Sequence, residues 1–333
     1  MRSLFTMFSL TEKSLYVAAI DLWIDSLRER ERCYVSHGHA DHARAHGTVV
    51  TSVNNARVCR LRFRHRPGRR DVTFEEHAFN EPWSAGGHRL TLFPAGHVLG
   101  SSQLLIEGDG GAFVYTGDFK LASSYTCEPP EVKKCDVLLM ECTFGRPQYV
   151  FPPRDEIEER IVAFATRALA DGCAPVFFAY ALGKAQEVMA ILTRANVPVT
   201  AHRDAYAMAG VYGAAGVALG TYRQYDAHAY DGTSALVWPP SRRNRPKALP
   251  KRPFRTAMLT GWAVDPGTQF RYGADEMIPL SDHADFPALV RYIERAEPKK
   301  VLLNHGWRDF ARQLRRQGIN AEYLEGRQQL ALF

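Results

Sequence analysis

The sequence predicts a mixed α/β protein in which a smaller α/β domain is inserted into a larger one. Short apolar runs, rich in β-branched and aromatic residues, recur through the first half of the 333-residue chain, which is typical of strands joined by tight turns. From about residue 154 to 255 such runs alternate with helical patterns, as in a layered α/β unit. After residue 256 the pattern returns to strand, helix and strand, so we expect the end of the chain to rejoin the first domain.

The individual elements follow from the spacing of apolar residues. We expect strands at 15–24, 89–93, 103–106, 112–115, 137–140, 176–179 and 301–303. Helical periodicity predicts helices at 154–170, directly after two prolines, and at 184–195 and 286–296. These elements divide the chain into one domain of residues 1–153 and 256–333 and an inserted domain of residues 154–255.

The composition excludes a disordered, fibrous or membrane-spanning protein. Apolar residues make up 46% and charged residues 23% of the chain, and no apolar run reaches the ~18–20 residues that a membrane span needs. The six cysteines are scattered and form no CxxC pair, which favours reduced thiols over disulfides or a zinc knuckle. We therefore expect a cytoplasmic protein without a membrane partner.

The positive charge is concentrated in three places, although 42 Lys and Arg against 36 Asp and Glu leave a net charge of only +6. Residues 57–70 contain seven arginines, and residues 242–255 contain seven cations interrupted by prolines, which predicts a loop. A third group has the spacing of one helical face: Arg308, Arg312, Arg315 and Arg316. A solvated surface explains one such run, but three separated runs favour binding of phosphate groups.

The densest chemical motif is SHGHADH at residues 36–42, directly after a short apolar strand. It places three imidazoles and a carboxylate within six residues: His37, His39, Asp41 and His42. These side chains are metal ligands, and in a loop after a strand alternate residues can point to two neighbouring ions. The motif therefore predicts a metal site, and one string can serve two ions.

Further candidate ligands follow later strands. His97 comes after one strand, in FPAGH, and Asp118 after another, in VYTGD, where its two carboxylate oxygens could bridge two cations. His283 in LSDHAD and His305 in LLNHG repeat the pattern near the end of the chain. We interpret six further histidines as structural (His46, His65, His77, His88, His202 and His228) and the lone thiol of Cys142 as a packing residue.

These motifs resemble a known family. The HxHxDH string resembles the signature of the metallo-β-lactamase fold, and the later ligands follow in the order of its dinuclear hydrolases. The segments ECTFG (141–145), SDHAD (281–285) and NHG (304–306) resemble motifs A, B and C of the nucleic-acid-processing β-CASP branch, and YALGKAQE (180–187) is similar to a helix start of its inserted domain. The set is most similar to bacterial DNA ligase-associated exonucleases. The resemblance implies an α/β fold, an αββα metallo-β-lactamase sandwich with an inserted α/β β-CASP domain.

The resemblance also implies two divalent metal ions, with zinc favoured by mixed nitrogen and oxygen ligands and manganese as the alternative. The first ion would be held by His37, His39 and His97, and the second by Asp41, His42 and His305, with Asp118 bridging. The family's first motif, which supports the ligand loop, matches Asp25, and Asp21 is the competing candidate.

The catalytic roles implied by the resemblance belong to Asp41, Glu141 and His283. Two metals would neutralise the phosphodiester and generate hydroxide near neutral pH. His283 would protonate the leaving oxygen, and Glu141 would orient His283. The implied activity is a metal-dependent DNA exonuclease in repair, functionally associated with a DNA ligase and a helicase.

Nucleic acid is the expected partner, with DNA favoured. We expect contacts from Lys184, Arg62, Arg64, Arg66, Arg242, Arg243 and Arg245. Phosphate contacts carry no sequence information, so binding should show weak sequence preference and steep salt dependence. A β-CASP ribonuclease or RNA 3′-end-processing enzyme is the main alternative, since a histidine at position 305 is associated with RNA-processing members. A small-molecule hydrolase and a non-catalytic nucleic-acid-binding protein are further alternatives.

Overall fold

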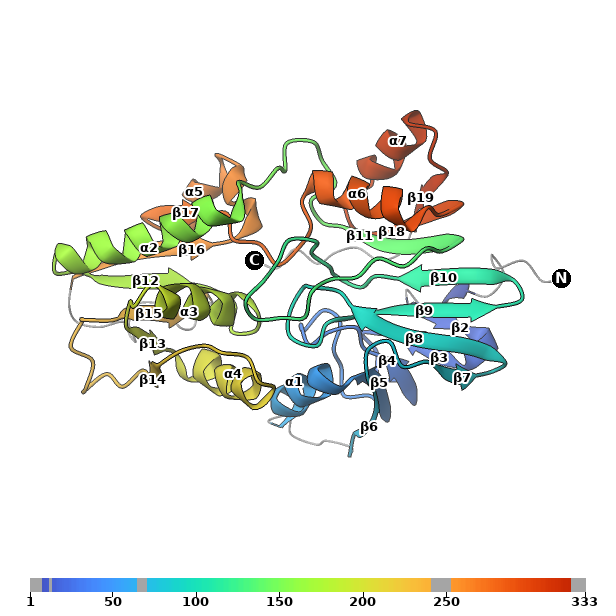
Figure 1. The fold of residues 1–333 in the computed structure, drawn as a ribbon, viewed down its shortest axis with the longest axis horizontal. Coiled ribbons are helices and arrows are strands. Elements are labelled where there is room, and N and C mark those ends of the chain that lie inside the picture. The colour runs from blue at the N-terminus through green and yellow to red at the C-terminus, as the bar shows by residue number, and fades with distance from the viewer. Residues whose placement is uncertain (1–7, 12–13, 65–70, 241–252, 325–333) are drawn as a thin grey trace. The chain divides into compact units, whose positions relative to one another are not determined.

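A computed structural model of the chain describes residues 8–11, 14–64, 71–240 and 253–324 (Figure 1). The chain divides into two compact units. Unit 1 comprises Met1–Ser123, Glu128–Tyr149 and His283–Phe333, and unit 2 comprises Ser124–Cys127 and Val150–Asp282. Unit 2 is therefore an insertion that interrupts unit 1.

Unit 1 contains two sheets. The first has the order β1 (Phe8–Thr11), β2 (Ser14–Val17), β3 (Leu22–Ile24), β4 (Arg32–Tyr34), β5 (Thr48–Ser52) and β6 (Thr73–His77). The second has the order β19 (Ala321–Tyr323), β18 (Lys300–Gly306), β11 (Val137–Cys142), β10 (Gly111–Tyr115), β9 (Ser102–Gly108), β8 (His88–Pro94) and β7 (Trp83–Ala85). In this second sheet β10, β11, β18 and β19 run parallel, so their carboxyl ends meet at one edge.

The two sheets face each other across a shared core, in which Ile24 and Val50 of the first sheet join Leu104 and Tyr115 of the second. Helix α1 (Val53–Phe63) packs on the first sheet through Phe63. Helices α6 (Phe286–Ala296) and α7 (Asp309–Arg316) pack on the second sheet, as Figure 1 shows. The layers are helix, sheet, sheet and helix, which is the predicted sandwich.

Unit 2 is a parallel sheet with helices. Its strand order is β14 (Tyr222–Gln224), β13 (Val199–Ala201), β15 (Ala235–Trp238), β12 (Ala174–Phe178), β16 (Phe254–Leu259) and β17 (Glu276–Ile278). Its helices are α2 (Arg154–Ala170), α3 (Lys184–Arg194), α4 (Arg203–Ala214) and α5 (Thr268–Tyr272). The central strand β12 is buried at every position, as expected for a parallel strand covered on both faces.

Local chemistry explains where the predicted helices begin. Helix α2 starts directly after Pro153 and carries two acidic residues in its first turn. Their negative charge interacts favourably with the positive end of the helix dipole. At the start of α6 the Asp285 carboxylate accepts the Ala288 N–H at 2.9 Å. At the start of α3 the Gln186 side chain accepts the Gly183 N–H at 2.9 Å. These caps satisfy N–H groups that the helices themselves leave without partners.

Three sequence-based expectations differ from the structure. The run 15–24 is two antiparallel strands, because a 3₁₀ turn at Ala18–Ile20 and a left-handed Asp21 reverse the chain. Helix α1 lies in a region that we expected to consist mostly of strands and tight turns, because its polar, arginine-rich sequence obscures its short buried face. Unit 2 continues to Asp282 rather than ending at residue 255, because β16 and β17 pair in its sheet.

Candidate metal centre

The histidine-rich loop of residues 36–42 lies in unit 1, directly beyond β4. The loop is fixed at its start, since Val35 N–H donates to Val50 O at 3.0 Å and Ser102 N–H donates to Ser36 O at 2.9 Å. His37 and His42 are buried, whereas His39 and Asp41 are half-buried. The loop therefore holds both buried and partly exposed candidate ligands.

Two other loops of unit 1 bring further ligands to the same place. His97 follows β8, and its Nε2 lies 2.9 Å from His39 Nδ1. Asp118 follows β10, and its Oδ2 lies 3.6 Å from His37 Nε2 and 3.4 Å from His42 Nε2. Among the described residues, three groups have ligand atoms within 4.8 Å of one another, as a metal ion requires: His37 with His39 and His97; His37 with His42 and Asp118; and His97 with Asp118 and His283.

The donor atoms fit a divalent cation. His37 Nε2 and His42 Nε2 are buried and make no hydrogen bond. A buried polar atom without a partner is costly, and a bound cation would satisfy both imidazoles at once. Imidazole nitrogen and carboxylate oxygen are ligands that Zn²⁺ and other divalent transition metals accept. The described residues could thus hold metal ions at this position.

Charge is distributed unevenly over the cluster. Burial and the neighbouring imidazoles His42 and His97 hold the pKa of His37 well below its usual range, so this ring is neutral. Burial also opposes charge on His42, but the carboxylates of Asp118 and Asp25 outweigh it and raise the pKa of His42 well above its usual range. Burial opposes ionisation of Asp118 too, and the charge on His42 outweighs it and keeps the pKa of Asp118 well below its usual range. The site therefore favours a positive charge between these groups.

The buried Asp25 carboxylate holds the histidine-rich loop in place. It is 1% exposed, and its Oδ1 accepts the Ser36 N–H at 2.8 Å. Its Oδ2 accepts the hydroxyls of Ser36 at 2.6 Å and Tyr115 at 2.7 Å, and lies 2.7 Å from His42 Nδ1. A carboxylate on Nδ1 orients the ring and leaves Nε2 available for a metal. Asp21, the competing candidate, lies on the surface, where the Tyr16 hydroxyl donates to it.

Ser36 and Tyr115 were not singled out by sequence reasoning. Ser36 directly precedes the histidine-rich string, and Tyr115 lies three residues before Asp118. The sequence shows that both residues lie near candidate ligands. Their shared contact with Asp25 joins three segments that are far apart in the chain, so it arises only on folding.

His283 and Glu141 form a pair next to the ligand cluster. His283 Nδ1 lies 2.9 Å from Glu141 Oε1 and 3.0 Å from Oε2. The Glu141 carboxylate is 1% exposed and also accepts the Phe119 N–H at 2.9 Å. The His283 ring lies 4.7 Å from the His97 ring, centroid to centroid. A buried carboxylate thus holds Nδ1 of His283, and His283 belongs to the third group of possible ligands.

Two predicted ligands are outside the three groups. His305, at the end of β18, has its ring 4.7 Å from the His42 ring. It has a left-handed backbone with a φ of 47°. Asp41 is half-buried in the loop and is in none of the groups that the described residues form. The predicted roles of Asp41 and His305 as ligands stay predictions.

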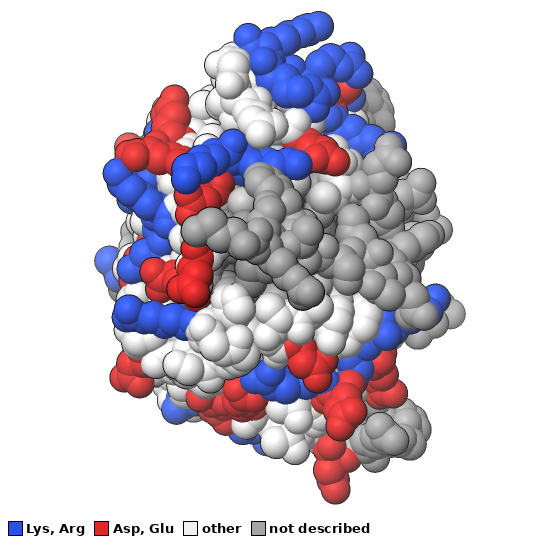
Figure 2. Space-filling model, turned by 90° about the vertical axis from the view of Figure 1, so that its right-hand side faces the viewer, with Lys and Arg blue, Asp and Glu red and all other residues white. Residues whose placement is uncertain are grey.

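The predicted nucleic-acid contacts are spread over the chain. Arg62 lies in α1, and the exposed Arg64 directly follows the end of this helix. Lys184 is 7% exposed, and its Nζ donates to Asp282 at 2.8 Å within unit 2. Arg66, Arg242, Arg243 and Arg245 lie outside the described residues. On the face drawn in Figure 2, basic and acidic side chains are interspersed.

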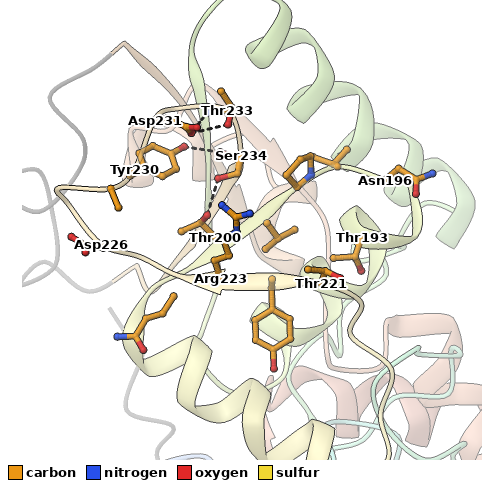
Figure 3. Close-up of a pocket in the computed structure, with 16 residues that line it drawn as sticks. Thr193, Asn196, Thr200, Thr221, Arg223, Asp226, Tyr230, Asp231, Thr233 and Ser234 are labelled. Carbon is orange, nitrogen blue, oxygen red and sulfur yellow. Dashed lines mark hydrogen bonds between the residues drawn. The ribbon is translucent and has the colours of Figure 1, made fainter.

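Unit 2 contains a separate pocket of 670 Å³ beside β13 and β14 (Figure 3). Most of the residues that line it are polar, and none of them is a histidine or cysteine. The Thr200 and Ser234 hydroxyls are 2.7 Å apart, and Asp231 accepts the Thr233 N–H and hydroxyl. These groups satisfy one another, so the pocket offers no reactive group comparable to the cluster in unit 1. Among the described helices, none is both long and apolar enough to cross a membrane.

Comparisons with known proteins show what the chain is similar to. The family described as "Zn-dependent metallo-hydrolase RNA specificity domain" matches residues 274–325. A "Probable DNA ligase" of Opitutus terrae is 38% identical over 313 residues, which cover 92% of this chain and 30% of that protein. An "RNase J-like protein" of Methanocaldococcus jannaschii is 25% identical over 270 residues, 66% of this chain and 64% of that protein.

Two further likenesses concern a shorter segment and the fold. An "Endoribonuclease ysh1" of Aspergillus fumigatus is 38% identical over 117 residues, 34% of this chain and 13% of that protein. The crystal structure of a protein of unknown function from Enterococcus faecalis superposes with a TM-score of 0.57 at 16% identity and covers 88% of this chain and 78% of that one. The chain spans less than two thirds of the two first relatives, at 30% and 64% of their lengths.

The layered sandwich and the imidazole–carboxylate cluster define a metallo-hydrolase. Together with the relatives, they support a likeness of the chain to the metallo-β-lactamase family and its β-CASP branch.

Proposed function

We propose that the protein is a metal-dependent DNA exonuclease that hydrolyses phosphodiester bonds in DNA repair. The observation that carries the proposal is the contact between the His283–Glu141 pair and the ligand cluster in one buried site. Bound cations can offset the charge of a phosphodiester, and a carboxylate-bound imidazole beside them can supply a proton. Cleavage of a phosphodiester needs both, because its leaving oxygen must receive a proton.

The residues divide into ligands and supports. His37, His39 and His97 would hold one cation, and Asp41, His42 and His305 would hold a second. Asp118 would serve both, since its Oδ2 lies 3.6 Å from His37 Nε2 and 3.4 Å from His42 Nε2. Bound divalent cations offset the charge of a phosphodiester and lower the pKa of a nearby water. Nitrogen and oxygen donors without a thiolate favour zinc and also accept manganese. Asp25 fixes the orientation of His42.

His283 supplies the proton to the leaving oxygen. Its Nδ1 is held by Glu141, so its Nε2 is the nitrogen that can face a substrate. The Glu141 carboxylate stabilises the charged imidazolium and prevents the ring from turning. The pair therefore acts as a positioned general acid, with a typical contribution of about 10²–10⁴ to the rate.

DNA is the proposed substrate because the relative that covers 92% of this chain carries the name "Probable DNA ligase". A functional association with a DNA ligase is part of the same proposal. A ribonuclease is the second candidate, favoured by a family match described as an RNA specificity domain and by relatives named as endoribonucleases.

Oligonucleotides of one sequence, made as DNA and as RNA and labelled at either end, would test the proposal. With zinc or manganese supplied, we expect mononucleotides to be released from one end of DNA faster than from RNA. Faster digestion of RNA would favour the second candidate, and internal cuts without terminal products would contradict an exonuclease. The Asp41→Ala variant should lose activity, and full activity in this variant would refute the proposed second ligand set.

A further inference from the structure

A cationic and aromatic cluster lies in unit 1 on the segments that follow Glu141 and His305. We call Arg146, Tyr149, Trp307 and Asp309 the Arg146 cluster. The Arg146 guanidinium lies 3.4 Å from the centroid of the Trp307 ring, and its Nη2 lies 3.4 Å from Asp309 Oδ2. The Trp307 ring is stacked on the Tyr149 ring with centroids 6.4 Å apart. A flexible arginine is thereby held in one place by a ring and a carboxylate.

Backbone contacts tie this cluster to the candidate site. Strands β11 and β18 are paired in parallel, and Glu141 and His305 are their last-but-one residues. Beyond the strands, Trp307 N–H donates to Cys142 O at 3.1 Å. Gly306 permits this approach, since a Cβ at its φ of 145° would overlap the Cys142 carbonyl. The two segments are thus locked together directly after the residues that they contribute to the site.

A line of aromatic rings gives a second connection. The Tyr149 ring lies 5.3 Å from the Phe144 ring, which in turn lies 6.2 Å from the His283 ring. Tyr149 O also accepts the Phe286 N–H at 2.9 Å, on the segment that follows His283. The Arg146 cluster is therefore built against all three segments that supply Glu141, His283 and His305.

Together with Arg312, the Arg146 cluster carries a net positive charge. Asp309 is shared by two guanidinium groups, those of Arg146 and of Arg312 at 3.2 Å, so one carboxylate faces two cations. The Arg146 side chain is 34% exposed. A guanidinium has five N–H donors in its plane, and stacking on a ring leaves those at its edge available. An exposed, oriented and incompletely neutralised arginine is suited to a phosphate oxygen.

We propose that Arg146 binds a backbone phosphate of the nucleic-acid strand next to the phosphodiester being cleaved, and that Trp307 is the positioning residue that holds it. The inference rests on the proposed function and adds a substrate-binding residue to it. Arg146 would contribute to the affinity for a strand and not to the chemical step, because it touches none of the candidate ligands in the structure.

Replacement of Arg146 by methionine tests this role. On a single-stranded oligonucleotide, Arg146→Met should raise KM about tenfold, the loss expected for one charge-assisted hydrogen bond, and leave kcat unchanged. Hydrolysis of bis(p-nitrophenyl) phosphate, which has no neighbouring phosphate, should be unaffected.

The matched control is Arg89→Met. Arg89 is an exposed, ion-paired arginine of unit 1 on β8. It lies about 16 Å along the strand from Pro94, the end of β8 that is nearest to the candidate site. KM should not change in this control.

The positioning by Trp307 has its own signature. Trp307→Leu should raise KM for the oligonucleotide, and adding it to Arg146→Met should produce little further change, because both variants remove the same contact. Binding of a fluorescent oligonucleotide, measured in EDTA so that turnover is not needed, should lose about 0.7 from the slope of log Kd against log salt in Arg146→Met.

Different outcomes contradict the two proposals. Wild-type protein that cleaves no phosphodiester would refute the proposed function, and the binding measurement would still decide the role of Arg146. A salt slope and KM in Arg146→Met equal to those of Arg89→Met would overturn the inference. So would a matching loss of bis(p-nitrophenyl) phosphate hydrolysis, because that result would place Arg146 in the chemical step or in the stability of the site.

Discussion

The same side chain has different properties at different positions in this protein. His37 and His42 are both buried in one loop, yet their pKa values are shifted in opposite directions, because only His42 lies between two carboxylates. His283 is held by a single buried carboxylate and keeps 21% of its side chain exposed. The environment of each imidazole, and not its residue type, separates the candidate ligands from the candidate acid.

The roles of His283 and Glu141 can be separated from metal binding. We expect His283→Gln to lower kcat on DNA about 10²–10⁴-fold while the metal content stays equal to that of the wild type, because the proton donor is lost and the other ligands remain. Glu141→Gln should lower kcat in the same direction by a smaller factor. Metal content by atomic emission and initial rates on labelled DNA would measure both.

The control for this pair is His88→Gln, since His88 is outside the cluster and bonds its own turn at Gly86 O. Its kcat should equal that of the wild type. Loss of metal in His283→Gln would contradict the assignment and would make His283 a ligand with His97 and Asp118, the third group that the geometry permits.

His46 predicts a pH dependence of stability that is separate from activity. Burial lowers its pKa from 6.5 to about 4, against the opposing charge of Asp25. The unfolded chain therefore binds a proton that the folded chain does not, and this part of the stability is complete above pH 6.5 and is lost as the pH falls toward 4. Between pH 7 and pH 5 the loss should be about 2 kcal/mol.

The variant His46→Asn isolates this effect. In the wild type the Arg30 N–H donates to His46 Nδ1 at 3.1 Å, and the side-chain oxygen of asparagine can replace Nδ1 as the acceptor. Urea unfolding of both metal-free proteins at pH 7 and pH 5 would give the free energies. The wild type should lose more stability than His46→Asn. Equal losses in the two proteins would show that His46 is not buried as a neutral ring.

At the scale of elements, the start of α3 explains the GKAQE motif. Gln186 caps the helix, Lys184 pairs with Asp282, and Glu187 is an acceptor for a segment distant in sequence. The Glu187 carboxylate is 2% exposed and accepts the hydroxyls of Ser124 at 2.6 Å and Thr126 at 2.5 Å. The Arg154 guanidinium donates to the same carboxylate. The motif thus joins Ser124–Cys127 to unit 2.

Removing the Glu187 carboxylate should destabilise unit 2. Glu187→Ala leaves buried hydroxyls and a guanidinium without their acceptor, and breaking such a buried pair costs about 3–5 kcal/mol. Glu187→Gln keeps acceptor and donor atoms and should cost less. Urea unfolding would measure the change, and hydrogen exchange of Ser124–Cys127 would locate it. Glu159→Ala, at an exposed position of α2, should stay within about 0.5 kcal/mol of the wild type. Equal stability of Glu187→Ala and Glu159→Ala would exclude this structural role.

At the scale of the whole molecule, the candidate centre depends on the folding of unit 1. Its ligands come from loops after β4, β8 and β10, which are separated by tens of residues in the chain. A cation that binds them cannot bind the unfolded chain equally well, so binding stabilises the folded state. At a free metal concentration of 100 times Kd the gain should be about 2.7 kcal/mol.

Chelation tests this coupling. Removing metal with EDTA should lower the Tm, and adding zinc or manganese should restore it. His37→Asn should lose the response, since His37 belongs to two of the three ligand groups, whereas Glu159→Ala should keep it. An unchanged Tm with either metal in the wild type would contradict a metal centre at this position.

The sequence alone determined the class of fold, the predicted helices and the identity of the clustered ligands, because hydrophobic periodicity and dense motifs are local properties of the chain. Helices at 154–170 and 286–296 were predicted at their observed bounds. Helix α1 was not predicted, since its arginines interrupt the apolar periodicity of the face that packs against the first sheet.

The tertiary structure decided which distant side chains meet. Pairing of β16 and β17 in the sheet of unit 2, the hydroxyls on Asp25, and the stacking of Arg146 on Trp307 all join residues far apart in the chain. No local pattern encodes such contacts, because each depends on strand order and on packing between layers. The sequence therefore identified candidate ligands, and the fold determined which residues lie against them.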